Sequence, residues 1–267
     1  MKFFVILLLF ISILFANSNS LIEQKKASKI EKKDTLVEEN FNEFDDFENE
    51  FSENDKLTEE VFDPLYSYNN WMTGVNDYLM INIVEPQAKV YRWVIPEGGR
   101  TSVLNAFKNL YFPVNFANNI LQTKVENAGN ETSRFLLNST IGILGLFDVA
   151  DSWFGIKPHV EDFGQTLGYY GAGSGFPVVL PFFGQRNVRD LFGTFADSYI
   201  DPIYYNDWRF YNTAEPYWHS VLLKGYEDFN EYSLTPEAYE KLTADSIDLY
   251  PFLRDAYEQY RNQLIKE

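Results

Sequence analysis

The sequence predicts an all-α fold. Apolar residues recur every three or four positions through most of the chain after residue 62, which is the spacing of one buried helix face. Proline, Asp, Asn or Thr stands where these stretches begin, as is typical of helix N-termini. No stretch sustains the period-two alternation of a half-buried strand. These three observations together predict a set of amphipathic helices.

The first residues have the pattern of an export signal. Met1 and Lys2 precede a mostly apolar run from Phe3 to Ala16, and small polar residues follow. The run is shorter than the ~20 residues of a membrane span. We therefore expect residues 1–18 to be a signal peptide on an exported chain, with an uncleaved anchor helix as the alternative.

Residues 19–60 are polar and become strongly acidic after Glu38. A segment with low hydrophobicity and a block of like charge buries too little apolar surface to offset the entropy lost on ordering. This stretch is therefore predicted to be a disordered tether. The alternative is one short amphipathic helix docked on a partner, because four phenylalanines recur at three- or four-residue spacing between Phe41 and Phe51.

A helical domain is expected over residues 61–267, with a core at 63–202 and a C-terminal helical extension at 203–267. Asp63 and Pro64 form a cap followed by a proline at the first helical position, which predicts a helix start. The core helices that periodicity and proline breaks predict are 63–79, 85–94, 101–111, 113–121 and 123–142. Asn187 is predicted to cap another helix, and three more are expected near 208–222, from Pro236, and over 248–267.

Glycine is concentrated between these helices. Seven of the 15 glycines lie between Gly155 and Gly184, and the apolar run 176–183 that ends this region carries no charge. Glycine costs about 0.5–1 kcal/mol of backbone entropy relative to alanine, so this density indicates unusual backbone geometry or mobility. We expect the stretch 162–184 to form a mobile apolar hairpin that faces lipid.

Composition excludes several classes of function. A net charge of −17 argues against nucleic-acid binding and against simple electrostatic docking on anionic lipid. The absence of cysteine excludes disulfides, thiolate catalysis and cysteine-ligated metals. With 24 Phe, 18 Tyr and 5 Trp, the chain has a large aromatic surface to place.

No catalytic motif is present, so an enzyme is not expected, nor is a metal or cofactor. The chain has two histidines, His159 and His219, and no nucleophile elbow or metal-binding helix motif. Gly173-Ser174-Gly175 resembles a nucleophile loop only superficially. Lipid hydrolysis through Ser174 and His159 is the weakest of the alternatives.

Several stretches closely resemble the VacJ/MlaA family. They are DPLYSYN at 63–69, PVNFANNILQ at 113–122, RFLLNSTIGILGLFD at 134–148, the run at 161–190, and YPFLRDAYEQYR at 250–261. The resemblance implies a ring-like bundle of helices with a central amphipathic channel for phospholipid. It also implies that phospholipid is removed from the outer leaflet of a Gram-negative outer membrane and passed to a soluble periplasmic carrier, and that the chain associates with trimeric porins.

The resemblance also assigns roles to particular residues. The glycine-rich hairpin is implied to line the channel and to move when lipid passes, through Gly168, Gly171, Gly173, Gly175, Phe176 and Pro177. Asn115, Asn118, Asn119 and Asn138 are candidates for the polar lining of the channel. For these asparagines, helix capping and backbone bonding are an equal alternative.

One departure from the family is clear. Typical members are lipoproteins that carry acyl chains on a cysteine, and this sequence has none. We therefore expect an unlipidated protein at the periplasmic face of the outer membrane, held there by its apolar body, a porin or its signal segment. The alternative function is a structural scaffold at the outer membrane that moves no lipid.

Overall fold

The computed structural model describes residues 61–204, 217–244 and 246–267. The described residues belong to one compact unit, Thr58–Glu267. The predicted signal peptide and tether lie outside the described residues, as does the segment 205–216 where one more helix was expected to begin.

Most of the described chain is helical, as predicted. The elements are α3 (Tyr66–Leu79), the π-helix η1 (Met80–Val84), α4 (Glu85–Val94), α5 (Glu97–Leu110), α6 (Phe112–Leu121), α7 (Val125–Thr140), α8 (Val149–Phe154), α9 (Phe163–Tyr169), β1 (Pro177–Leu180), β2 (Gly184–Asn187), α10 (Val188–Asp197), α11 (Tyr217–Leu234), α12 (Pro236–Ala244) and α13 (Leu249–Lys266).

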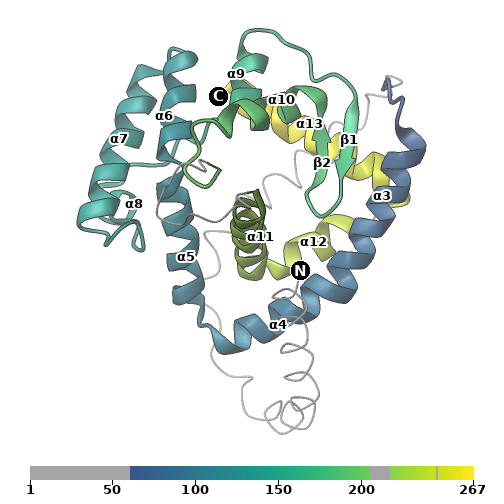
Figure 1. Ribbon diagram of the computed structural model, residues 1–267, viewed down its shortest axis with the longest axis horizontal. Helices are drawn as coiled ribbons and strands as arrows, with labels where there is room; N and C mark the ends of the chain where they lie inside the picture. The colour runs from purple at the N-terminus through teal and green to yellow at the C-terminus, as the bar shows by residue number, and fades with distance from the viewer. Residues whose placement is uncertain (1–60, 205–216, 245) are drawn as a thin grey trace, which may run out of the picture. The chain divides into compact units, whose positions relative to one another are not determined.

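Contacts between these helices close into a ring (Figure 1). Helix α3 continues through η1 into α4, and α11 bridges α4 to α5. Helix α5 contacts α6 and α7, α6 contacts α9, and α13 joins α9 back to α3. The strands β1 and β2 lie against α3 and α13 respectively. The fold is therefore the ring-like helical bundle that the family resemblance implies.

Helix ends follow local chemistry. Asn187 caps α10 as predicted, because its side chain accepts a hydrogen bond from the Asp190 amide. Helix α5 begins four residues before the predicted start. The break between α4 and α5 comprises Ile95 and Pro96, both extended, and Ile95 is extended because it precedes a proline. The glycines at 98 and 99 are part of the first turn of α5.

The glycine-rich stretch divides into three parts, where a single hairpin over 162–184 was expected. Residues 163–169 form α9, because Asp162 accepts a hydrogen bond from the Gln165 amide and no proline follows until Pro177. Residues 170–176 connect α9 to the hairpin. The hairpin itself is β1 and β2, in antiparallel register with Val178 opposite Arg186.

Close packing requires two of the glycines outside the hairpin. Helices α9 and α10 approach each other so closely that a Cβ on Gly193 would lie 2.3 Å from the Gly164 backbone nitrogen. Elsewhere in the fold, the aromatic side chains of Phe112 and Phe135 stack between α6 and α7, with 4.4 Å between their centroids.

Within the part of the chain that the structure describes, no helix combines the length and hydropathy needed to cross a membrane.

Candidate functional site

Two asparagines of α3 hold the hairpin. Asn69 is fully buried; its amide oxygen accepts from the Val179 N–H at 2.9 Å, and its amide nitrogen donates to the Pro177 carbonyl at 3.0 Å. Asn76, two helical turns later, donates to the Leu180 carbonyl and accepts from the Phe182 N–H, both at 2.9 Å. These side-chain amides take the place of a neighbouring strand along the free edge of β1.

The same helix face joins the hairpin to the C-terminal helix. The Asn69 amide nitrogen lies 3.1 Å from the Tyr250 hydroxyl of α13, and that hydroxyl donates to Asp63. Burial and the hydrogen bond to the Asp63 carboxylate raise the pKa of Tyr250 above its ordinary value, so the hydroxyl stays a donor. The residues of the first matched stretch, 63–69, therefore bind the hairpin and α13 together.

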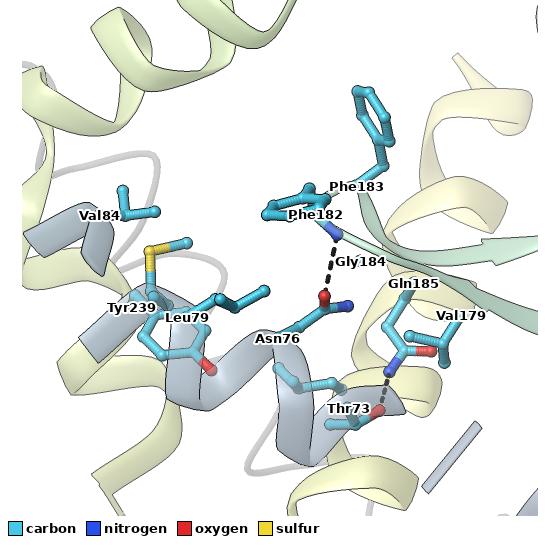
Figure 2. A pocket seen from close by; sticks show the side chains of 12 residues that line it. Thr73, Asn76, Leu79, Val84, Val179, Phe182, Phe183, Gly184, Gln185 and Tyr239 are labelled. Atoms are coloured by element: carbon cyan, nitrogen blue, oxygen red, sulfur yellow. Dashed lines mark hydrogen bonds between the residues drawn. The ribbon is translucent and has the colours of Figure 1, made fainter. Parts of the chain in front are cut away.

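A pocket of about 230 Å³ opens beside the hairpin turn (Figure 2). In Figure 2 the turn lies on one side, and α3 with Val84 on the other. Its walls come from the end of α3, η1, the hairpin, α12 and α13. The lining residues are Thr73, Asn76, Leu79, Met80, Val84, Val179, Phe182, Phe183, Gly184, Gln185, Tyr239 and Leu253. No Asp, Glu, Lys, Arg or His is among these lining residues.

The four asparagines predicted as channel lining are buried between helices. Each of their amide nitrogens donates to protein, for example from Asn118 to the Asp197 carboxylate at 2.9 Å and from Asn119 to the His159 carbonyl at 3.0 Å. Asn115 donates to Glu131 and Asn138 donates to Asp148. They do not line the pocket. A role in a channel stays a prediction for these residues.

An exposed apolar loop follows α7. Residues 141–147 carry no charge, and Ile143, Leu144 and Gly145 all have left-handed backbone angles with φ of 54°, 57° and 87°. This conformation is rare for a β-branched residue such as Ile143. Leu144 is 77% exposed, and Ile141, Ile143 and Phe147 are also exposed.

Polar residues of α7 and the N-cap residue of α8 hold this loop in place. Arg134 donates to the Asp148 carboxylate at 2.7 Å and also to the Ile156 carbonyl. The Asn138 amide bridges Asp148 and the Ala150 N–H. Sequence reasoning did not single out Arg134 or Asp148, although both belong to the stretch 134–148 that carried the family resemblance.

Comparisons with known proteins agree with this architecture. The family model described as MlaA lipoprotein matches residues 61–264. The chain belongs to the MlaA lipoprotein family.

Relatives in the MlaA family come from several bacteria. The Escherichia coli protein named "Intermembrane phospholipid transport system lipoprotein MlaA" is 34% identical over 151 residues, which are 55% of this chain and 59% of that protein. An uncharacterised protein of Rickettsia prowazekii is 35% identical over 147 residues, which are 55% of this chain and 58% of its own length. The matched region therefore spans less than two thirds of these relatives.

A solved structure is also similar. It comes from work on the "structural basis for maintenance of bacterial outer membrane lipid asymmetry" and matches with a TM-score of 0.65 at 29% identity. The match covers 76% of this chain and 99% of that one.

In this MlaA-family chain, the six residues predicted as a gate have different surroundings. Gly168 lies in α9 against Ile265, where a Cβ would approach the Ile265 Cδ1 atom to 2.4 Å. Gly171, with φ of 85°, and Gly173 are exposed in open space. Gly175, with φ of 76°, faces Val188. Phe176 is half-buried, and Pro177 is buried at the start of β1. The six residues thus lead into the hairpin that borders the pocket.

The C-terminal helix is locked to α9 and α10 by Arg261, which sequence reasoning missed. Its guanidinium contacts both carboxylate oxygens of Asp162, at 2.7 and 2.8 Å, and Asp190 at 2.9 Å. Burial opposes ionisation of Asp162, but Arg261 holds the pKa of that carboxyl below its ordinary value. Nothing local in the sequence marks this pair, because the partners lie 99 residues apart.

Proposed function

We propose that this chain transports phospholipid to maintain outer-membrane lipid asymmetry, removing it from the outer leaflet and passing it to a periplasmic carrier. Membership of the MlaA family supports this, together with the name of the Escherichia coli relative. The transfer makes and breaks no covalent bond, so we propose a transporter and not an enzyme.

The observation that carries the proposal is the exposed apolar surface on a chain of this family. Large exposed apolar patches mark contacts with a membrane or another protein. The uncharged loop 141–147 is such a patch, and the nearby helix α8 adds the exposed side chains of Trp153 and Phe154. Surfaces of this composition suit the interfacial region of a bilayer.

We propose that the mature protein lies at the periplasmic face of the outer membrane. The sequence contains no cysteine for acylation, so its apolar surface and a porin trimer would hold it there. Within the proposal, residues 1–18 are a signal peptide, 19–60 an acidic tether, and 61–267 the lipid-handling domain. A soluble periplasmic protein would receive the lipid.

The transport proposal is tested by deleting the gene in its own host. Surface-exposed phospholipid and detergent sensitivity should both rise, and the wild-type gene supplied on a plasmid should restore both. The measurement is chemical labelling of outer-leaflet phospholipid in intact cells. An unchanged outer leaflet in the deletion strain would exclude transport and leave a scaffold role.

We also propose that the segment 168–177 is the moving wall of the lipid path, with Asn115, Asn118, Asn119 and Asn138 near it. Gly173 has open space around its Cα, so Gly173→Ala adds a methyl group without a clash. Gly173→Pro stiffens the same position further. Reduced backbone freedom should slow lipid export several-fold, with the free energy of unfolding within about 1 kcal/mol of wild type.

Gly129→Ala is the matched control, since Gly129 also lies in open space but within α7. That variant should transport lipid normally. Wild-type asymmetry in cells carrying either Gly173 variant would remove the gating role from this segment.

A further inference from the structure

A π-helix forms one wall of the pocket beside the hairpin turn. None of the five residues of η1 is buried, although four of them are apolar. Met80 and Val84 line the pocket, while Ile81 and Ile83 are exposed. Single-turn π segments are rare and often occur at functional sites. The wall therefore presents apolar side chains that the fold itself leaves only partly covered.

The opposite wall is held in a strained shape. Phe182 has a left-handed backbone, with φ of 68°, and its side chain is 77% exposed. Aromatic residues seldom adopt this conformation, and such strain persists only where surrounding contacts impose it. The Asn76 amide imposes it here, because it accepts from the Phe182 N–H, as Figure 2 shows, and donates to the Leu180 carbonyl. Hydrogen bonds within the chain therefore shape this wall of the pocket.

The polar groups of the lining are largely occupied. Thr73 accepts from Gln185 at 3.2 Å, as Figure 2 shows, and the Tyr239 hydroxyl donates to Asp77 at 2.8 Å. Both polar atoms of the Asn76 side chain bond the hairpin. Within the described chain, Gln185 Oε1 is the one side-chain oxygen or nitrogen of the lining that is buried without a hydrogen-bond partner. One neutral acceptor cannot balance the charge of a headgroup, so the chemistry of the pocket suits an apolar ligand.

We propose that this pocket binds a single acyl chain of a phospholipid. Its volume of about 230 Å³ is smaller than the ~300–1,000 Å³ of pockets that enclose whole small ligands, so it accommodates a chain segment and not an entire lipid. This inference rests on the proposed transport function and deepens it. One acyl chain lies between η1 and the hairpin turn, while the headgroup stays outside.

The test uses a phosphatidylethanolamine with a photoreactive diazirine midway along one acyl chain. The full-length protein is irradiated with this lipid in detergent micelles, and adducts are located by mass spectrometry. Adducts should concentrate on η1 and on the turn around Phe182 and Phe183. Val84→Trp, which fills the pocket, should reduce labelling of the turn at least five-fold. Val94→Trp is the matched control, at an exposed α4 position outside the pocket, and should leave labelling unchanged.

Leu253→Phe narrows the pocket from α13 and serves as a second variant if Val84→Trp fails to fold. Adducts confined to the outer apolar surface, or turn labelling that survives both filling variants, would overturn the acyl-chain site. Neither result bears on whether the protein transports phospholipid, because the gene deletion tests that proposal separately. Conversely, pocket labelling with no deletion phenotype would uphold the acyl-chain site and remove transport.

Discussion

At the scale of single residues, a half-buried carboxylate links helices α6, α9 and α10. Asp197 accepts hydrogen bonds from the Asn118 amide and from the Phe163 N–H, both at 2.9 Å. Burial raises the pKa of Asp197 to about 6, from an ordinary value of 3.8, and these hydrogen bonds only partly offset the effect. Asp197 is therefore a source of pH-dependent stability.

The direction of this dependence follows from proton binding. Between pH 3.8 and about 6, Asp197 is protonated in a larger fraction of folded molecules than of unfolded molecules. The contribution of Asp197 to stability is thus fully present below pH 3.8 and is lost as the pH rises through 6. We expect urea unfolding to show that the wild type loses stability relative to Asp197→Asn between pH 4 and 7. A difference between the two proteins that stays constant with pH would contradict the raised pKa.

At the scale of elements, the hairpin depends on α3 more than on its own four-residue strands. Asn69→Ala leaves the buried Pro177 carbonyl and Val179 N–H without their amide partner. Each unpaired buried group costs about 1–3 kcal/mol, so we expect a loss of roughly 2–5 kcal/mol in the free energy of unfolding.

Hydrogen exchange at the Val179 amide measures this directly and should accelerate in the Asn69→Ala variant. Asn82 provides the control, because its side chain is exposed and bonds the Tyr78 carbonyl one helical turn earlier. Asn82→Ala should change stability by less than about 0.5 kcal/mol. Equal effects of the two substitutions would show that the α3 amides do not hold the hairpin.

At the scale of the whole molecule, α13 closes the ring and Arg261 fastens it. Arg261→Met removes the cation that the partly exposed Asp162 and the buried Asp190 share, and leaves Asp190 with Arg189 alone. Breaking a fully buried ion pair from one side costs about 3–5 kcal/mol. The exposure of Asp162 and the remaining Arg189 contact reduce that cost, so a fall in thermal stability at or below the lower end of this range is expected. Limited proteolysis should then cut within α13 before it cuts α6 or α7.

Two further variants separate geometry from charge at this site. Arg261→Lys keeps the charge but loses the two-pronged contact with Asp162, so it should lie between wild type and Arg261→Met. Lys266→Met removes an exposed charge from the same helix and should be close to wild type. Proteolysis of α13 at the wild-type rate in Arg261→Met would show that other contacts close the ring.

The sequence by itself determined the features that depend on near neighbours. The helical class, the cap at Asn187 and the break before Pro96 follow from side chains within four residues of the backbone they affect. Family membership was also readable, because the matched stretches carry it directly. The extent of the glycine-rich hairpin could not be read from the sequence, since the same residues suit a short capped helix and a turn.

Only the tertiary structure decided what borders the pocket and what closes the ring. The asparagine contacts with the hairpin join residues 104 to 110 positions apart, and Arg261 meets Asp162 across 99 positions. An isolated Asn or Arg in an amphipathic helix looks like any other polar residue. Its role appears only when the chain has folded back and brought an unpaired carbonyl, amide or carboxylate within hydrogen-bonding distance.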